Sequence, residues 1–449
     1  MQPAEENRAE VILRLCLVMV VAVIPLILDP ASSYFIFDAP KARAVQLLAL
    51  FAFAAWLIRE RTGETGWDWR EPLTRPLVFY AGALIVATIL SAAPTIALLG
   101  DVRRREGLLT QIAYLAICGL TARELGRPWL VRRWVGLLVA TATVVAGYGL
   151  LQYTGREPII RVLNDRPVGS LGNPGSFGGY LAMALPFAVM VFLRARSWLG
   201  VGLAGVSISA IFFGILVSYS RAAWGASIGA LAMGAWLLLR TRTTLDMRRV
   251  VVAVSLMGLL AAAFFWPRSP LGVSGAAGVV PPSERIGENL DIGPRQRVLV
   301  WRRALQVIRD RPLFGVGPDL FRFSMDMSTL GPQYRNVLGV SRRTHNVFLE
   351  VATTTGLIGL AAFVWTVFTY LAAVWHALPG LSDQRRAVAI TSAAGCVGFL
   401  LWTQFLPNTS GTSPIFWAML GMGAAVAGQV GRPAAPPPVP PQDPRPGAR

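Results

Sequence analysis

Apolar runs of about 17–22 residues recur along the 449-residue chain, and each is close to the ~20 residues that a helix needs to cross a bilayer. A soluble domain of this length would alternate apolar and polar faces instead. Hydrophobic residues make up 54% of the chain, and the mean hydropathy is +0.52. The sequence therefore predicts an all-α, polytopic membrane protein.

We expect about twelve spans in a single transmembrane domain that covers residues 1–429. The expected spans are residues 11–28, 42–58, 76–93, 107–122, 134–153, 175–193, 198–217, 222–239, 249–266, 346–375, 387–406 and 413–429. Residues 267–345 form one connection far longer than the others, with helices that lie on the membrane surface. Residues 430–449 are rich in proline, and we expect a disordered tail there.

Arginines in the short loops indicate the orientation of these spans, because basic residues favour the cytoplasmic side. Every second short loop is basic, with pairs such as Arg132 and Arg133, or Arg240 and Arg242. This pattern predicts that both termini lie in the cytoplasm and that residues 267–345 lie in the periplasm. The outer loops also carry arginines, and the net charge is +18. Anionic lipid head groups would explain that charge, and so would an anionic ligand at the outer face. We do not expect nucleic acid as a partner, because the basic residues are divided among membrane loops.

His345 is one of two histidines in the chain, and it stands between a basic loop and an apolar segment. Thr344 could cap a helix that runs unbroken to His376, and Glu350 would lie within its second turn. Such a helix is about 46 Å long, which places His345 at or above the outer membrane surface. Nearby arginines would lower the pKa of the imidazole and keep it neutral, as a proton acceptor must be. The alternative is an interfacial histidine with an ordinary hydrogen bond.

Two arginines stand where an anion could bind. Arg221, in "SYSRAAW", starts the eighth span, and it either extends to lipid head groups or binds an anion. Arg297 lies in a helix predicted to rest on the membrane surface. That helix has an apolar stripe of Val298, Trp301, Leu305 and Ile308 beside a basic stripe of Arg295, Arg302 and Arg309. Arg297 lies at the edge of the apolar stripe, so it could point under the helix.

Two loops complete the candidate site. "LGDVRRREGLL" (99–109) contributes Arg104, and "GSLGNPGSFGGYLAMALP" (169–186) has glycines that would let the backbone approach a ligand or re-enter the membrane. The sequence has no paired acidic motif, no His/Cys ligand motif and no phosphate-binding glycine loop. We therefore expect arginines, and not a bound metal, to neutralise an anionic leaving group. The three cysteines lie inside apolar runs and fit plain packing.

Five segments in order resemble the O-antigen ligase and O-antigen polymerase superfamily. They are "GDVRRREG", "GNPGSFGGYLAMALP", "SRAAW", the pattern R-x-x-x-W followed by "DRPLFGVGP", and "THNVFLEVATTTGLIGL". The similarity covers about residues 95–425. It implies a glycosyltransferase of the bacterial inner membrane that moves a glycan from undecaprenyl diphosphate to an acceptor hydroxyl at the periplasmic face, without a cofactor. By this resemblance His345 is the base, and Arg221, Arg297 and Arg104 bind the diphosphate. Asn346, Glu350 and Arg343 would support them.

The resemblance leaves the acceptor open. It is a lipid A–core sugar for the ligases, which is the alternative that we favour. It is another repeat unit for the polymerases and a protein side chain for the oligosaccharyltransferases. A transporter or lipid flippase is a non-enzymatic alternative, but transporters tend to bind at the membrane midplane between internal repeats. A glycosyltransferase of the shape, elongation and division family is a further alternative, and it would rely on an acidic residue instead of His345.

Overall fold

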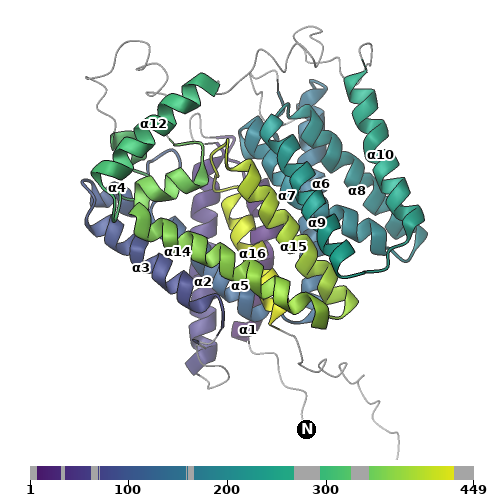
Figure 1. Ribbon diagram of the computed structural model, residues 1–449, viewed down its shortest axis with the longest axis horizontal. Coiled ribbons are helices and arrows are strands. Elements are labelled where there is room, and N and C mark those ends of the chain that lie inside the picture. Colours follow the sequence, from purple (N-terminus) through teal and green to yellow (C-terminus); the bar gives the residue numbers. More distant parts are fainter. Residues whose placement is uncertain are drawn as a thin grey trace, which may run out of the picture.

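The computed structural model describes residues 8–31, 36–61, 69, 71–157, 159, 166–266, 294–324 and 343–428. These residues form helices and connecting turns, with no β-strand among them, so the predicted all-α class is confirmed. Figure 1 shows long helices packed side by side, with α12 (Pro294–Asp310) crossing one end of the bundle. Both stretches 267–293 and 325–342 lie outside the described residues, as does the predicted tail. The placement of the long loop as a whole and the disorder of the tail therefore stay predictions.

Each of the predicted spans falls on a helix, and eight of the described helices are long and apolar enough to cross a membrane. These are α1 (Arg8–Ala22, continued by the 3₁₀ turn η1, Ile24–Leu26), α2 (Asp38–Arg61), α6 (Pro128–Tyr153), α7 (Pro174–Arg194), α8 (Trp198–Val217), α9 (Arg221–Arg240), α10 (Met247–Phe265) and α14 (Val347–Ala377). The remaining predicted spans are helices α3 (Thr74–Ile89), α5 (Leu108–Glu124), α15 (Asp383–Trp402) and α16 (Ser413–Ala427). The structure thus describes a polytopic membrane protein, and a count of about twelve spans stays a prediction.

Short elements connect the long helices. They are α4 (Pro94–Leu99), η2 (Gly169–Leu171), η3 (Phe321–Ser324) and η4 (Leu378–Gly380).

Contacts between helix termini show which termini lie together at each end of the bundle. At the end that carries His345, Gln46 Nε2 of α2 donates to Thr110 Oγ1 of α5 (2.7 Å), and the Val347 amide of α14 donates to the Thr403 carbonyl after α15 (2.9 Å). At the opposite end, Arg59 at the close of α2 pairs with Glu124 at the close of α5, with 2.6 Å between Nη2 and Oε1. Successive helices therefore run in alternating directions, as spans joined by short loops should.

The helix after His345 differs from its prediction in two ways. It begins at Val347, and its N-cap is Asn346, whose Oδ1 accepts from the amides of Phe348 and Leu349 (3.0 and 3.1 Å). The prediction that Thr344 caps this helix was therefore wrong. The helix is also broken at Gly356, whose φ of 70° and ψ of −174° lie outside helical values. The unbroken 46 Å rod expected from the sequence was wrong, because glycine permits a backbone turn that other residues resist.

The break in α14 is filled by the segment that follows α12. The Val316 and Gly317 amides donate to the Thr353 and Thr354 carbonyls (both 2.9 Å), and the Leu357 amide donates to the Pro312 carbonyl (2.7 Å). Backbone groups freed within a membrane protein need partners of this kind. The "RPLFGVGP" segment thereby fixes the angle between the two halves of α14, and with it the position of the residues before Val347.

The glycines at the start of α7 serve helix packing. A Cβ atom at Gly178 would meet the Ser218 side chain, and one at Gly179 would meet the Trp402 ring. Asn173 caps the helix by accepting from the Gly175 amide (2.7 Å), and the first eighteen residues of α7 are nearly all buried. The segment therefore does not re-enter the membrane as a loop, and its glycines let α7 approach α9 and α15 closely.

Candidate active site

The backbone of His345 is held in an unusual conformation. Its φ of 56° lies in the left-handed region, which costs a residue other than glycine roughly 1–2 kcal/mol. The neighbouring Thr344 is fixed at three atoms. Its amide and Oγ1 donate to Glu350 Oε2 (2.8 and 3.1 Å), and its carbonyl accepts from Trp301 Nε1 of α12 (2.9 Å). These contacts hold the strained residue in place and direct its ring.

Asn346 fixes the other side of His345. Its Oδ1 caps α14, while its Nδ2 donates to Gln404 Oε1 just after α15 (3.0 Å). Two of the predicted supporting residues therefore anchor the neighbours of His345. Glu350 binds Thr344 on one side, and Asn346 caps α14 on the other. Each was inferred from its place in the motif, and the structure gives each a hydrogen-bonding partner.

The surroundings of His345 favour its neutral form. Burial, together with the positive charges of Arg297, Arg104 and Arg343, lowers the pKa of His345 to about 3. The imidazole is therefore unprotonated at neutral pH, as the sequence analysis expected. Its Nδ1 is buried and has no hydrogen-bond partner among the residues that the structure describes. A neutral imidazole ring among arginines can accept a proton from a bound hydroxyl.

Arg297 lies on α12, where the sequence left open whether its side chain points under the helix or into water. Its side chain is half-buried, and its Cζ lies 5.9 Å from the centre of the Phe405 ring. The buried face of α12 differs from the predicted stripe. Val300, Ala304 and Val307 pack on Phe321, whereas Val298 and Leu305 are exposed. The predicted stripe was expected to face the membrane surface, and its exposed members Val298 and Leu305 remain available to one, so this part stays a prediction.

Arg104 lies on a loop closed by two glycines. The backbones at Gly100 and Gly107 approach so closely that neither position has room for a Cβ atom, and Gly100 has a φ of 81°. Asp101 starts the loop, and its carbonyl accepts from the amides of Arg104 and Arg105 (3.0 and 2.8 Å). The "GDVRRREG" segment therefore folds into a compact turn that directs the charge of Arg104 towards His345.

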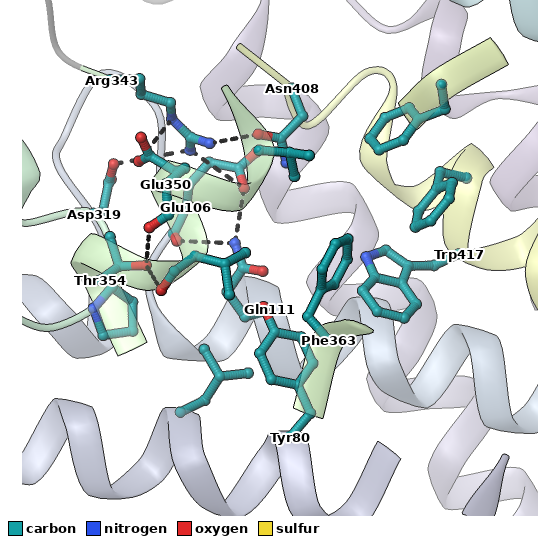
Figure 2. A pocket seen from close by; sticks show the side chains of 16 residues that line it. Tyr80, Glu106, Gln111, Asp319, Arg343, Glu350, Thr354, Phe363, Asn408 and Trp417 are labelled. Atoms are coloured by element: carbon teal, nitrogen blue, oxygen red, sulfur yellow. Dashed lines mark hydrogen bonds and ion pairs between the residues drawn. The ribbon is translucent and has the colours of Figure 1, made fainter. Parts of the chain in front are cut away.

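A buried cluster, which we call the Arg343 cluster, lies beside His345 and comprises Arg343, Glu106, Asp319, Glu350 and Asn408 (Figure 2). Arg343 is 5% exposed and donates to Asn408 Oδ1 (2.9 Å). Its guanidinium lies 3.7 Å from Glu106 Oε2, and 3.9 Å from both Asp319 Oδ1 and Glu350 Oε1. Three carboxylates thus surround one guanidinium, and two of them come from loops far apart in the sequence.

The Arg343 cluster has three carboxylates and one guanidinium, and burial shifts the pKa values of two of its acids. Burial raises the pKa of Glu106, although Arg343 and hydrogen bonds from Ser410 (2.8 Å) and Tyr114 (2.9 Å) oppose the shift. Burial also raises the pKa of Asp319, against Arg343 and Arg104. For Arg343 itself, burial lowers the pKa, but the three carboxylates more than compensate and raise it above its usual value. The guanidinium is therefore permanently charged, whereas Glu106 and Asp319 retain protons more readily than exposed acids do.

The Arg343 cluster forms the polar wall of a cavity of about 50 Å³. The opposite wall is apolar and aromatic, with Tyr80, Phe363 and Trp417 (Figure 2). The cavity is too small for a sugar, so the cluster supports the loop residues around His345 instead of holding a substrate ring.

The structure brings Arg104, Arg297 and Arg343 around His345, but Arg221 is not among the charges that act on the imidazole. Arg221 is exposed at the first turn of α9, where Ser220 caps the helix by accepting from the Ala223 amide (3.3 Å). Arg166 lies against the same turn and donates to the Ser218 carbonyl (2.8 and 3.0 Å). Arg221 and Arg166 therefore form a separate basic region at the entry to α9.

Sequence reasoning missed several residues of this end. Glu106 and Asp319 were passed over as acids in basic or glycine-rich loops. Lys41 is fully buried, and its Nζ donates to the carbonyls of Ile27 and Ser170, the latter at 2.7 Å. A lysine within the first turns of an apolar span is the one signal that could have identified it, because membrane helices rarely carry such charges without a partner.

Comparison with known families agrees with this geometry. The model of the O-antigen ligase family matches residues 206–364, a range that contains Arg221, Arg297 and His345 but not Arg104. No curated protein matches the chain. Members of the matched family are glycosyltransferase-type enzymes, and the apolar helices agree with a multi-pass protein of the bacterial inner membrane. The resemblance to the O-antigen ligase and O-antigen polymerase superfamily is therefore confirmed over residues 206–364.

Proposed function

We propose that this protein transfers a glycan from undecaprenyl diphosphate to an acceptor hydroxyl. The acceptor oxygen attacks the anomeric carbon, the bond from that carbon to the diphosphate oxygen breaks, and the diphosphate leaves with the electron pair. The proton of the acceptor hydroxyl passes to His345. The products are the glycosylated acceptor and the lipid diphosphate.

The observation that carries this proposal is the neutral His345 held among arginines. Its lowered pKa keeps the imidazole able to accept a proton, and the negative charges of a bound diphosphate would offset the arginines as the imidazolium forms. Glu350, Asn346 and Arg343 act as positioning residues through Thr344 and the cap of α14.

Arginines supply the positive charge that the leaving diphosphate needs. Arg297 and Arg104 lie near His345, and Arg221 would bind the donor from the entry to α9. Guanidinium groups bind phosphate oxygens with two parallel hydrogen bonds, so this reaction needs no metal ion. Transfer in purified membranes should therefore survive EDTA, and a loss that magnesium restores would contradict this part of the proposal.

We place the reaction at the periplasmic face, with both termini in the cytoplasm. The short basic loops support this orientation, and so does the contact of α12 with the residues around His345. Arg103→Cys at the His345 end should react with a membrane-impermeant thiol reagent when only the outer membrane is permeable. Arg242→Cys, at the opposite end, should be protected. The reverse pattern would invert the topology.

We favour lipid A–core as the acceptor. Deletion of the gene distinguishes the three acceptors on a gel of surface glycans. Loss of long chains from lipid A–core indicates a ligase, a single repeat unit left on the core indicates a polymerase, and altered glycoproteins with unchanged glycolipid indicate an oligosaccharyltransferase.

The catalytic roles are tested by two variants that should fail differently. His345→Ala removes the proton acceptor, so transfer should fall by about 10²–10⁴-fold while donor binding persists. Arg221→Ala should weaken both donor binding and transfer, and Arg221→Lys should restore them only in part. His376→Ala is the matched control, because the second histidine is exposed near the end of α14. Near-normal transfer by His345→Ala would make the histidine structural, and Glu350 would then be the first candidate for the base.

A further inference from the structure

A large apolar cavity lies far from His345, between α7, α9, α10 and α15. Its volume is about 520 Å³, which is within the range of about 300–1,000 Å³ that is usual for ligand sites. We call it the apolar groove, and its lining includes Pro186, Val189, Ala230, Leu238, Val250 and Met257. The groove exists because α10 packs on α8 and α7 and contacts α9 little, while α9 packs on α15 and α7. Figure 1 shows α10 at the edge of the bundle.

The length of the apolar groove matches one leaflet of a bilayer. Its lining on α9 runs from Ala230 to Leu239, which is about 14 Å at 1.5 Å per residue. Half of a ~30 Å hydrocarbon core has nearly the same depth. The lining on α10 runs from Met247 to Met257 and covers a similar depth. An occupant that enters from the end opposite His345 would therefore be a chain of one leaflet, and not a polyprenyl chain whose diphosphate lies at the His345 end.

The mouth of the apolar groove is basic. Arg242 is among the lining residues, and the loops that frame the mouth, 194–197 and 240–249, hold Arg194, Arg196, Arg240, Arg248 and Arg249 with Asp246 as the one acid. Arg249 already has partners within the protein, since its Nη1 donates to the Leu193 carbonyl (3.2 Å) and its Nε lies 3.5 Å from Asp246 Oδ2. Arg242 and Arg248 are exposed and stand where a lipid phosphate would lie.

Aromatic residues mark the same end as a membrane interface. Trp198 is 93% exposed at the start of α8, and Trp236 stacks on Trp375 with ring centres 5.2 Å apart. Exposed tryptophans collect at the level of lipid head groups. Basic pockets between spanning helices at this level bind acidic lipids. We propose that the apolar groove holds one acyl chain of an anionic phospholipid, with its phosphate at Arg242 and Arg248.

The proposal is tested by native mass spectrometry of the full-length protein in detergent, with phosphatidylglycerol or phosphatidylcholine of the same chain length added. We expect the protein to retain one phosphatidylglycerol, with about three- to tenfold less phosphatidylcholine, since one arginine near a lipid phosphate contributes about 1 kcal/mol. Equal retention of the two lipids would overturn the assignment of the head group. Displacement of the bound lipid by polyprenyl phosphate at equal concentration would overturn the assignment of the occupant.

Two pairs of variants locate the site. Ala235→Trp fills the apolar groove and should reduce retention at least tenfold, whereas Ala232→Trp, on an exposed face of the same helix outside the lining, should not. Arg242→Gln should remove most of the preference for phosphatidylglycerol, and the matched Arg132→Gln, at an exposed position near the start of α6 outside the loops of the mouth, should leave it unchanged. Thermal unfolding of each variant in detergent identifies any that misfolds. Wild-type retention by a folded Ala235→Trp would overturn the groove assignment.

Discussion

At both ends of the bundle arginines pair with carboxylates, but they do so in different ways. At the end opposite His345, Arg14, Arg59 and Arg127 pair with Glu10 and Glu124, and the Arg59–Glu124 and Arg127–Glu10 pairs are short, at 2.6 and 2.9 Å. In the Arg343 cluster the corresponding separations are 3.7–3.9 Å, and three acids share one guanidinium. The first arrangement joins helices directly, whereas the second is loose and has excess negative charge.

The difference follows from what each cluster must hold. At the ends of α1, α2 and α5, the Arg59–Glu124 pair (2.6 Å) and the longer Arg14–Glu124 pair (3.9 Å) hold rigid helices against one another. The Arg343 cluster instead joins loops, at Glu106, Asp319 and the residues before α14, and those loops carry Arg104 and Arg343, two of the three arginines whose charges act on His345. The Asp319 carboxyl of the cluster also interacts with the charge of Arg104. We infer that the tight end gives stability and that the loose end sets the electrostatics of the site.

Removal of Arg343 should have the largest effect, because it leaves three buried carboxylates without their cation. Breaking a buried charge arrangement in this way costs about 3–5 kcal/mol, so Arg343→Met should lower the temperature of unfolding strongly and abolish transfer. Adding Glu106→Gln should recover part of the stability by removing one of the excess acids. The measurement is thermal unfolding in detergent beside a transfer assay.

Arg59→Met at the opposite end sharpens the comparison. It should also destabilise the protein, because Glu124 is 7% exposed, but the folded fraction should retain transfer. Two results would contradict the inferred roles of the two ends. One is loss of transfer in folded Arg59→Met protein, and the other is a lower temperature of unfolding for Arg343→Met when Glu106→Gln is added.

The break in α14 should be nearly as sensitive. Gly356→Ala places a side chain at a φ of 70°, against the Leu313 backbone, and should cost more than about 2 kcal/mol and most of the transfer activity. Gly258→Ala is its control, because Gly258 lies inside α10 with nothing within 4 Å of the added Cβ. That control should be neutral or slightly stabilising. Equal effects of the two variants would show that the break does not position His345.

The pH dependence of transfer tests the electrostatics of the site. Because burial and three arginines lower the pKa of His345 to about 3, kcat/KM for the donor should stay flat from pH 8 to pH 5 with respect to this group. The same lowered pKa contributes to the stability of the folded state. This contribution is complete above the ordinary histidine pKa of about 6.5 and is lost as the pH falls towards 3. A protonation limb near pH 6.5 that disappears in His345→Gln would contradict this environment.

The sequence predicted the helical class and a helix at each expected span, because apolar length is a local property. It also allowed for a partly buried Arg297 on α12 and assigned a lowered pKa to His345, since nearby arginines could be counted. It did not predict the break at Gly356, because a glycine inside an apolar run has the same local appearance whether or not a distant loop inserts beside it. Nor did it predict the Arg343 cluster, whose acids come from residues 106, 319 and 350 and meet only in the folded chain.

The smallest effect should come from the Arg322–Asp101 pair, which joins the loop of Arg104 to the segment after α12. Arg322 Nη1 lies 2.9 Å from Asp101 Oδ2, but the arginine side chain is 38% exposed. An ion pair that water reaches contributes up to about 1 kcal/mol, so Arg322→Gln should change the temperature of unfolding little. Transfer should nevertheless fall about two- to fivefold, because Asp101 accepts the loop amide of Arg103 (2.9 Å) and its carbonyl orders Arg104.

The matched variant is Asp383→Asn at the opposite end, which removes the 71% exposed partner of Arg386 and leaves the hydrogen bonds from Arg386 to the Leu378 and Leu381 carbonyls in place. It should have an equally small effect on unfolding and no effect on transfer. Because the two variants remove the same kind of surface pair, any difference in transfer between them measures what the His345 end requires beyond stability. Equal transfer rates would mean that the loop of Arg104 is held without Arg322, and that the closely spaced Gly100 and Gly107 are sufficient to place it.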